Sequence, residues 1–402
     1  MMNIPEMRFK GFNDEWRRNK LKKMVTRIGD GLHGTPEYAD NGSMFFINGN
    51  NLKNGKIIIF NNTKKVIKQK LNYQLDNNTI LMSINGTIGN LAYYNNENVM
   101  LGKSICYLIN NINYLNTHFL YVLMHTSNVH RQFVLHLTGS TIKNLSLKII
   151  RDLDINYPTL SEQQQIGAFF SKLDALISAQ SKKLTLLKQL KHGYLQRMFP
   201  QADQTIPRVR FSGFNDKWQS KKLNIMFNFY KGKGLGIQQL NGTKYPAIIY
   251  GELYTKYHEI INNVFSQSNS QGFLGYKNDL LFPGSSTVAN GTAQANALMV
   301  DNVQLGGDII IARPKQDDID SSFMSYQINS QKSKLYPIIV GTTITHMYGK
   351  DLSKLKFMIT GLLEQQKIGS LFAKLDHLIE LQNHKLALLQ QLKKGYLQKM
   401  FC

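Results

Sequence analysis

Apolar and polar residues alternate with a helical period over two long stretches of the chain. In residues 160–200 the apolar positions lie three and four residues apart, from Ile166 to Met198. This spacing places them along one side of an α-helix and is typical of a coiled-coil seam. Residues 362–402 repeat the spacing. A helix of about 38 residues would span ~57 Å.

The two helical stretches are copies of each other. Residues 162–199 read EQQQIGAFFSKLDALISAQSKKLTLLKQLKHGYLQRMF, and residues 364–401 match them at about two-thirds of positions with a constant offset of 202. Because two globular blocks must fit at their ends, we expect the helices to pair antiparallel. The apolar residues expected to pair the helices are Ile166, Phe170, Leu173, Ile177, Leu184 and Leu187 in the first helix, and Ile368, Phe372, Leu375, Ile379, Leu386 and Leu389 in the second. Leu176, Leu190, Leu378 and Leu392 follow the same apolar spacing.

One polar residue interrupts the apolar pattern of each helix at matching positions, Gln180 and Gln382. A buried polar residue on a seam can fix register and pairing. A glutamine at the solvated edge of a wide seam would give the same pattern. The sequence leaves both interpretations open.

Two blocks of about 155 residues precede the helices and share only short landmarks. Residues 5–16, PEMRFKGFNDEW, recur as PRVRFSGFNDKW at 207–218, and GSTI at 139–142 recurs as GTTI at 341–344. Residues 57–60 and 309–312 are typical of strands, whereas 117–136 and the shorter 320–331 are typical of helices. The prediction is an α/β (α+β) fold, a tandem repeat with pseudo-two-fold symmetry. It has two globular domains with mixed or antiparallel sheets (1–159 and 201–361), joined by antiparallel coiled-coil helices (160–200 and 362–402).

Charge adds a class of partner to this picture. The formal net charge is +22. Residues 1–159 carry 19 basic and 10 acidic side chains, a net of +9, and residues 205–361 carry 17 and 10, a net of +7. A basic excess spread over both halves favours a polyanion such as nucleic acid as the partner. A basic surface kept for solubility is the alternative.

Cysteine content and hydropathy bound the environment of the chain. The two cysteines, Cys106 and Cys402, suggest neither a disulfide framework nor a cysteine-based zinc site. No apolar run approaches the roughly 20 residues that cross a bilayer, and the first residues do not resemble a signal peptide. We expect a reduced, cytoplasmic protein with no membrane partner.

Motifs of catalysis are missing from the expected positions. No Pro-Pro pair occurs, as an adenine-methylating motif would need, and LGKS at 101–104 lacks the first glycine of a phosphate-binding loop, which is replaced by Glu97. His258-Glu259 is not followed by the second histidine of a zinc motif. A non-enzyme with no metal site and no cofactor of its own is therefore predicted.

The repeated motif PxxRFxGFNDxW and the helix pattern EQQxIGxxFxKLDxLI…KLxLLxQLKxGYLQxMF resemble the specificity subunit of Type I restriction–modification systems. The resemblance covers essentially the whole chain. It implies a DNA-binding subunit in which each target-recognition domain reads half of a bipartite, asymmetric site on double-stranded DNA. The helices would set the unread gap between the halves and help bind two methyltransferase subunits.

The resemblance also implies further partners and a location. Restriction subunits, which are ATP-dependent translocases and nucleases, would complete the enzyme. S-adenosylmethionine, ATP and Mg²⁺ would bind to the partner subunits, and phage-encoded DNA mimics would be a class of inhibitor. The chain would lie in the bacterial cytoplasm, at the nucleoid when bound to DNA.

Candidate DNA contacts lie in turns that resemble recognition loops of this family. Asp30 could accept a hydrogen bond from a cytosine amino group, and lysines suit phosphates. Each turn could equally be a plain surface turn, and alternating tyrosines are also typical of a buried strand. The candidates are Asp30, His33, Gly34, Thr35, Asn85, Thr87, Ser140, Thr141 and Lys143 in the first block, and Lys231, Lys233, Tyr250, Glu252, Tyr254, Ser285, Ser286, Thr287, Thr342, Thr343 and His346 in the second.

Three other functions compete with this interpretation. A fused restriction–methylation enzyme would carry the same domains, but the missing catalytic motifs argue against it. A coiled-coil protein that binds nucleic acid without sequence preference would not need two divergent blocks. A sequence-reading module of another DNA-methylation or phage-defence complex is the remaining alternative.

Overall fold

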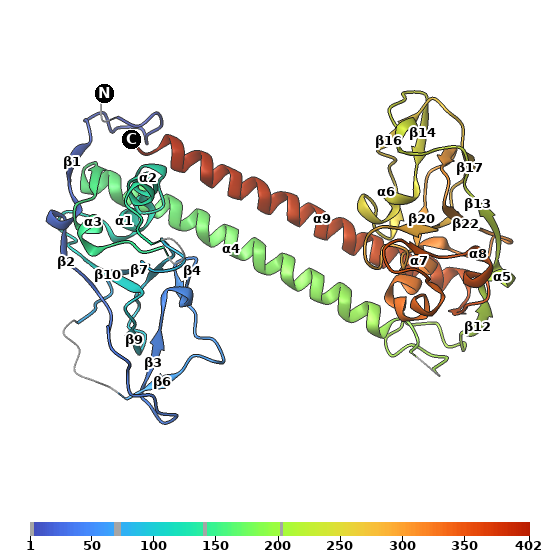
Figure 1. The fold of residues 1–402 in the computed structure, drawn as a ribbon, viewed down its shortest axis with the longest axis horizontal. Helices are drawn as coiled ribbons and strands as arrows, with labels where there is room; N and C mark the ends of the chain where they lie inside the picture. Colours follow the sequence, from blue (N-terminus) through green and yellow to red (C-terminus); the bar gives the residue numbers. More distant parts are fainter. Residues whose placement is uncertain (1–3, 68–73, 140–142, 202–203) are drawn as a thin grey trace. The chain divides into compact units, whose positions relative to one another are not determined.

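The computed structural model describes residues 4–67, 74–139, 143–201 and 204–402. The chain forms two compact units (Figure 1). Unit 1 comprises Met1–Ser181 and His384–Cys402, and unit 2 comprises Lys182–Asn383. The long helices are α4 (Leu160–Arg197) and α9 (Leu362–Lys399), so each unit contains a segment of both.

In unit 1 the first part of α4 packs against the last part of α9. The Phe169 ring lies 4.9 Å from the Tyr396 ring, centroid to centroid. Further along α4, Oδ1 of Asp174 lies 2.5 Å from Nζ of Lys393. The partner positions descend along α9 as those on α4 ascend. The two segments therefore run antiparallel, as predicted.

The same arrangement recurs in unit 2. Nζ of Lys191 lies 2.6 Å from Oδ1 of Asp376. Phe199, just beyond the end of α4, stacks on Phe372 with ring centroids 5.8 Å apart. The partner positions again descend along α9. The expected antiparallel pairing is confirmed in this unit as well.

The positions predicted to pair the helices are all buried or half-buried, whereas four other apolar positions with the same spacing are exposed. Ile166, Phe170, Leu173, Leu184, Ile368, Phe372, Leu375 and Gln382 are buried, and Ile177, Gln180, Leu187, Ile379, Leu386 and Leu389 are half-buried. Leu176, Leu190, Leu378 and Leu392 are instead 42–48% exposed. The apolar stripe on each helix is wider than the surface that its neighbours cover.

Both hydrophobic cores contain residues from the long helices. In unit 1, Phe119 of the globular part belongs to the same cluster as Phe170 of α4 and Met400 next to α9. In unit 2, Phe323 is clustered with Phe199 and Phe372 in the same way. The helix pair is therefore anchored inside each core and is not an appendage on its surface.

Unit 1 is built on an antiparallel sheet of four strands, with a smaller mixed sheet beside it (Figure 1). The strands of the first sheet, in spatial order, are β2 (Val25–Asp30), β10 (Ile105–Asn110), β7 (Thr79–Ser83) and β8 (Leu91–Tyr93). Those of the second are β6 (Lys65–Val66), β3 (Met44–Ile47) and β9 (Val99–Leu101), and a further pair is β4 (Leu52–Lys53) with β5 (Lys56–Ile57).

The helix expected at 117–136 is two helices, which is a correction to the prediction. These are α1 (Thr117–Leu123) and α2 (Ser127–Leu135), followed by the short α3 (Leu147–Arg151). The hydroxyl of Thr126 accepts a hydrogen bond from the backbone N–H of Val129. Threonine is a favoured N-cap residue, so Thr126 ends the continuity and starts a new helix.

Unit 2 repeats this design, and within the described residues its two main sheets each have one more strand. The larger sheet contains β13 (Phe227–Lys231), β22 (Ile309–Pro314), β18 (Leu280–Pro283), β20 (Asn296–Leu298) and β15 (Ile260–Ile261). The second contains β16 (Ser266–Ser268), β14 (Tyr245–Ile248), β21 (Val303–Leu305) and β17 (Phe273–Gly275), and β19 (Ser285–Ser286) pairs with β23 (Thr345–His346). The helices are α5 (Leu223–Met226), α6 (Tyr250–Thr255), α7 (Ser321–Ser330) and α8 (Gly349–Leu352). The sheets are antiparallel or mixed, as predicted.

A short antiparallel strand pair closes each globular block. Strand β1 (Arg17–Lys20) pairs with β11 (Asp154–Tyr157), and β12 (Gln219–Lys222) pairs with β24 (Lys356–Ile359). The first pair aligns Arg17 with Tyr157, and the second aligns Gln219 with Ile359. Both partners are shifted by 202 positions, so the two blocks leave the helical framework through the same geometry.

The repeated PxxRFxGFNDxW motif fastens the chain to the framework in unit 1. The Arg8 guanidinium donates to both carboxylate oxygens of Glu162, at 2.8 and 2.6 Å. The N–H of Met7 donates to the carbonyl of Lys399 at 2.9 Å. The buried Trp16 ring lies 5.8 Å from that of Phe401. The motif thus joins the start of α4 to the end of α9.

The second copy of the motif makes the equivalent contacts in unit 2. Arg210 donates to both carboxylate oxygens of Glu364, at 2.6 and 2.8 Å, and the Trp218 indole N–H donates to the same group at 3.2 Å. The N–H of Val209 donates to the carbonyl of Arg197 at 3.0 Å. The constant residues of the repeat therefore have a structural role in holding the framework together.

Candidate nucleic-acid interface

Four loops of unit 1 meet at one end of its main sheet. We name them loop cluster 1, which comprises residues 30–35, 84–89, 101–104, 138–139 and 143–144 of the described chain. Leu32 N–H donates to the carbonyl of Leu101 at 2.7 Å, and Ile84 N–H donates to that of Ser104 at 2.9 Å. Gly86 N–H donates to the carbonyl of Lys143 at 2.9 Å. Three turns predicted separately as DNA contacts therefore lie together.

The predicted side chains of loop cluster 1 are largely exposed. Nε2 of His33 lies 2.7 Å from Oδ2 of Asp30, so the two residues form a pair. The amide of Asn85 donates to the carbonyl of Lys103 at 3.4 Å. The remaining predicted residues are exposed, and these are Gly34, Thr35, Thr87 and Lys143. Ser140 and Thr141 lie outside the described residues.

Unit 2 brings the corresponding loops together. Loop cluster 2 comprises residues 231–236, 284–291, 305–308 and 340–346. Lys233 N–H donates to the carbonyl of Leu305 at 3.3 Å. Gly284 N–H donates to that of Asp308 at 2.6 Å, and its own carbonyl accepts from Met347 N–H at 2.9 Å. The loops differ in sequence from those of unit 1 but converge in the same way.

The predicted side chains of loop cluster 2 divide into exposed and internally bonded groups. Ser285 and Ser286 are buried. Oγ of Ser285 lies 3.1 Å from Nδ1 of His346, and Oγ of Ser286 donates to the carbonyl of Val288 at 2.9 Å. The exposed members are Lys231, Lys233, Thr287, Thr342 and Thr343.

The run 250–254 lies on helix α6 and not on the buried strand that its alternating tyrosines could equally have formed. Tyr250 and Tyr254 are half-buried on this helix. Glu252 is buried, and its carboxylate accepts from Ile249 N–H at 3.2 Å and from Nζ of Lys256 at 2.7 Å. A DNA contact by Glu252, which stays a prediction, would compete with these bonds.

Glycine permits the close approach of loops at equivalent places in the two units. A Cβ on Gly31 would lie 2.2 Å from the carbonyl oxygen of Leu101, and one on Gly232 would lie 1.9 Å from that of Gly306. Any larger residue would push the loops apart. Gly31 and Gly232 also donate to matching carbonyls, those of Ile105 at 3.1 Å and Ile309 at 2.8 Å.

Sequence reasoning missed two charged residues of the loop clusters. Lys103 is exposed in loop cluster 1, within the LGKS string that was rejected as a phosphate-binding loop. Asp308 contributes a carboxylate to loop cluster 2 and lies 3.1 Å from Nζ of Lys231. Lys103 could have been found by its place in a Gly-Lys-Ser turn, whereas no motif marks Asp308.

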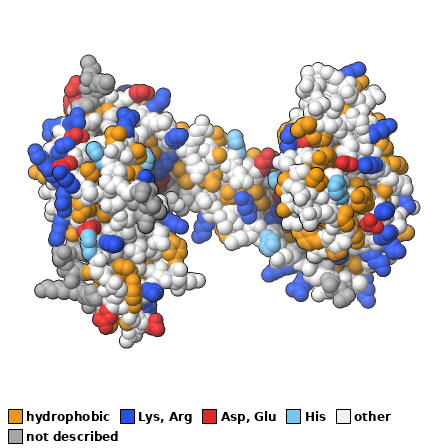
Figure 2. Space-filling view, in the orientation of Figure 1, with side chains coloured by type: hydrophobic (Ala, Val, Ile, Leu, Met, Phe, Trp, Pro, Cys, Tyr) orange, Lys and Arg blue, Asp and Glu red, His pale blue; other side chains and the backbone are white. Residues whose placement is uncertain are grey.

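Lysine and arginine are spread over the visible face of both units (Figure 2). Unit 1 has a cluster of five basic residues at 17–23, and several of them have acidic partners. Arg18 and Lys20 both lie 2.9 Å from Asp154, and Lys22 lies 2.8 Å from Asp152. Hydrogen bonds from Lys20 and Arg18 hold the pKa of Asp154 below its ordinary value. The positive charge of this cluster is therefore partly neutralised.

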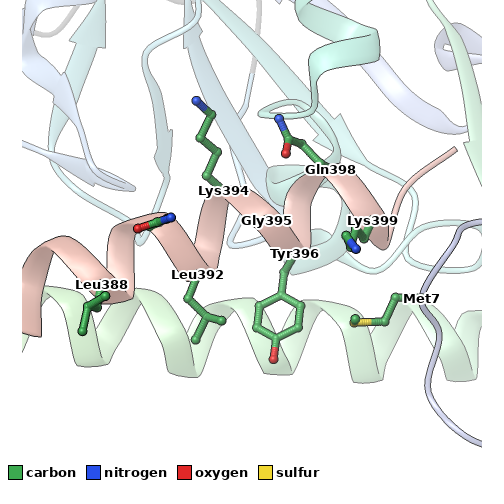
Figure 3. Close-up of a pocket in the computed structure, with 9 residues that line it drawn as sticks. Met7, Leu388, Leu392, Lys394, Gly395, Tyr396, Gln398 and Lys399 are labelled. Atoms are coloured by element: carbon green, nitrogen blue, oxygen red, sulfur yellow. The ribbon is translucent and has the colours of Figure 1, made fainter.

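A second surface is an apolar groove on the last part of α9. Leu388, Leu392 and Tyr396 project from one side of this helix in a row with Met7 (Figure 3). The groove has a volume of about 700 Å³. Leu388 is 51% exposed, as is its copy Leu186 at 54% on α4. Each unit therefore presents apolar side chains from one long helix.

The described ranges contain neither a candidate membrane span nor a candidate metal site. Among these residues, no helix combines the length and hydropathy needed to cross a membrane. Within the same part of the chain, no group of three or more His, Cys, Asp or Glu side chains is arranged to hold a metal ion.

Comparison with protein families gives one match that covers both halves. The family model described as the Type I restriction modification DNA specificity domain matches residues 13–189 and again residues 215–391. The two matches are offset by the same 202 positions as the helix copies.

Similar proteins are known at low sequence identity. The specificity subunit of the type I restriction enzyme MjaVIII from Methanocaldococcus jannaschii is 22% identical over 271 residues, 64% of this chain. The match spans 63% of that relative, less than two-thirds of its length. The putative MjaX specificity subunit of the same organism is 23% identical over 334 residues, 76% of this chain and 73% of that protein. The crystal structure of the Type-I restriction-modification S subunit from M. genitalium shares the fold, with a TM-score of 0.63, 16% identity and 99% of each chain covered.

Proposed function

The chain belongs to the family of the Type I restriction modification DNA specificity domain, and from this premise we propose how it acts. It is the DNA-reading subunit of a Type I restriction–modification enzyme. Unit 1 reads one half of a bipartite, asymmetric site on double-stranded DNA, and unit 2 reads the other half. The family match supports the role as specificity subunit. The DNA and protein partners are the part that we propose here.

One observation carries this proposal: the framework is repeated while the loops that it holds are not. The Arg–Glu contacts, the closing strand pairs and the helices recur at an offset of 202. Loop clusters 1 and 2 converge through matching backbone contacts but present different side chains. A constant scaffold that holds two divergent surfaces suits a protein that reads two different short sequences.

The chemistry of the loops suits DNA. Exposed lysines, such as Lys103 and Lys143 in loop cluster 1 and Lys233 in loop cluster 2, can neutralise phosphates and position the protein. Hydroxyl, imidazole and carboxylate groups in the same loops can hydrogen-bond base edges. Affinity would come mainly from the first set of residues and sequence preference from the second.

We propose that this chain contributes no catalytic group of its own. One group of side chains in loop cluster 2 resembles a hydrolase triad, and it consists of Ser285, His346 and Asp308. The contacts within it differ from those of a triad. In a triad the histidine contacts both the serine and the acid. Here Ser285 Oγ contacts both His346, at 3.1 Å, and Asp308, at 3.2 Å. The acid does not orient the imidazole, so the serine is not activated in this way.

We propose that the exposed apolar side chains of the long helices help bind two methyltransferase subunits. Leu186 and Leu388 are copies that both remain about half exposed, and large exposed apolar patches commonly mark protein interfaces. The helices would also set the unread gap. Restriction subunits would complete the enzyme, and S-adenosylmethionine, ATP and Mg²⁺ would bind to the partner subunits.

Selection from a random DNA library tests the proposed function. The complex of this chain with its methyltransferase subunits is mixed with random-sequence duplexes, and bound molecules are sequenced. The expected result is enrichment of two different short blocks at a fixed separation. Binding that falls with salt but enriches no sequence would instead identify a non-specific nucleic-acid-binding protein.

A further inference from the structure

Asp308 lies where three loops of loop cluster 2 meet. Nζ of Lys231 is 3.1 Å from its Oδ1, and the hydroxyl of Ser285 donates to its Oδ2 at 3.2 Å. Ser285 in turn contacts Nδ1 of His346 at 3.1 Å. The Asp308 side chain is nevertheless 47% exposed. Its carboxylate is held in one place while free positions on its oxygens still face the surface.

The backbone at this position does not require a carboxylate. Asp308 has a φ of 57° and follows Gly306 and Gly307. Glycine or asparagine adopts this left-handed conformation at least as easily as aspartate does. Residues held in such conformations cluster at functional sites. The backbone conformation therefore does not explain why this residue is an aspartate, and the carboxylate itself has the role.

Electrostatics restricts what this carboxylate can face on DNA. Next to a phosphate it would be repelled, and an ionised carboxylate can only accept hydrogen bonds. The donors on base edges are the amino groups of cytosine and adenine in the major groove and of guanine in the minor groove. A carboxylate paired with one lysine on the proposed DNA-binding surface is therefore suited to a base amino group.

We propose that Asp308 determines specificity by accepting a hydrogen bond from one base amino group in the half-site that unit 2 reads. Lys231 and Ser285 act as positioning residues, because their contacts with the two carboxylate oxygens orient the side chain. This inference rests on the proposed function of the chain. It adds a residue that the sequence did not mark.

Unit 1 also has a carboxylate at the corresponding end of its sheet, but it lies on the neighbouring strand. Asp30 ends β2 and lies opposite Cys106 of β10, whereas Asp308 directly precedes β22, which pairs with β13. Asp30 is held by His33, at 2.7 Å. Strands β2 and β10 occupy the positions of β13 and β22. Each loop cluster thus offers one carboxylate within its described residues, and the two lie on neighbouring strands, which suits two different half-sites.

The test compares three variants of the chain in the complex with its methyltransferase subunits. Asp308→Asn keeps the shape and tolerates the backbone conformation but removes the charge. Asp30→Asn makes the same change in unit 1. Asp317→Asn is the matched control, since Asp317 is exposed beyond the opposite end of β22. Each complex selects from random duplexes, and affinity for the wild-type motif is measured separately.

Asp308→Asn is expected to relax one base position in one half-site and to weaken binding to the wild-type motif about tenfold. Asp30→Asn should relax a position in the other half-site, and Asp317→Asn should change neither. An unchanged motif with Asp308→Asn overturns the inference, and so does tighter binding to all sequences, which would place the carboxylate beside phosphate. If the wild-type complex enriches no bipartite motif, the proposed function fails as well.

A second measurement keeps the wild-type protein and alters the DNA, in case Asp308→Asn does not assemble. Each amino-bearing base of the motif is replaced in turn by an analogue that lacks the amino group. Each half-site should contain a position at which the analogue weakens binding about tenfold. If one half-site tolerates every analogue, no carboxylate reads it, and the inference is wrong for that unit or for both.

Discussion

At the scale of single residues, two Arg–Glu pairs hold the framework, and they are more buried than most ion pairs. The Arg210 and Glu364 side chains are 11% and 0% exposed, and the Arg8 and Glu162 side chains are 10% and 1% exposed. Removing one partner of a buried pair leaves an uncompensated charge in the core. These residues are therefore expected to stabilise the two units.

Glu364→Ala is expected to destabilise unit 2 by about 3–5 kcal/mol, because Arg210 would stay buried without its acid. Glu6→Ala is the comparison, since the Glu6 carboxylate is 76% exposed and lies 3.9 Å from Lys399. An exposed pair contributes about 1 kcal/mol or less. Urea unfolding of both variants measures the difference. Equal midpoints would show that the buried pair is not a structural fastener.

Lys103 and Lys143 should each act on DNA affinity through charge alone. Replacing either by alanine is expected to weaken binding to all sequences. It should also reduce the magnitude of the slope of log K against log salt concentration by about one. Lys22→Ala serves as the control, because Lys22 is paired with Asp152 at 2.8 Å. A salt titration of the complex on cognate and scrambled DNA gives both quantities. A loss confined to cognate DNA would assign these lysines to base reading instead.

Only some residues of this surface could be found from the sequence. The turns around Asp30 and Lys143 can be recognised in the sequence by their glycine and polar residues. Asp308 does not, because its environment arises only when Lys231, Ser285 and His346 arrive from three distant loops. Glu252 was proposed for its place beside tyrosines, yet the fold buries its carboxylate against Lys256 and Ser266.

At the scale of elements, the long helices present two kinds of leucine. Leu389 is half-buried on the seam, and the neighbouring Leu388 is 51% exposed along the groove of Figure 3. Adjacent positions on a helix point about 100° apart. One residue can therefore stabilise the helix pair while the next is free for a partner.

Leu388→Asp is expected to leave folding intact and to weaken methyltransferase-subunit binding about tenfold or more, as loss of a buried interface anchor does. Leu389→Asp and its copy Leu187→Asp should abolish assembly by disrupting the helix pair. Ala387→Asp, at an exposed position of the same helix, is the charge control. Thermal unfolding and subunit binding separate these effects. If Leu388→Asp binds like Ala387→Asp, the groove is not a docking surface.

A helix with a long repeated sequence pattern can be predicted, whereas a break that depends on one residue cannot. Helices α4 and α9 were predicted because a repeated apolar period runs through 38 residues of each. The break between α1 and α2 was not, because apolar residues continue up to Met124 and only the cap at Thr126 divides the helix. Leu176 and Leu190 share the apolar spacing but are exposed, since periodicity cannot say how much of an apolar stripe is covered.

At the scale of the whole molecule, the tandem repeat was visible in the sequence, whereas the sheet order was not. Strand β10 lies between β2 and β7, so neighbours in the sheet are distant in the chain. The closing pairs β1–β11 and β12–β24 have the same register. This shared register predicts that the two globular blocks can be exchanged on one framework.

Replacing residues 17–157 by a second copy of residues 219–359 should therefore give a folded chain. Both units would then carry loop cluster 2, and the selected DNA site should contain two halves of identical sequence. The random-library selection described above reads out this result directly. Two half-sites that still differ would mean that sequence preference arises outside the exchanged blocks.

The most direct test of the central claim is a long-read methylation map of host DNA with and without the gene for this chain. The account predicts that N6-methyladenine disappears from one bipartite, asymmetric motif when the gene is deleted and returns on complementation. Both half-sites would be read from the same map. An unchanged map, in cells shown to produce the chain together with its methyltransferase subunits, would contradict the claim that this protein directs methylation.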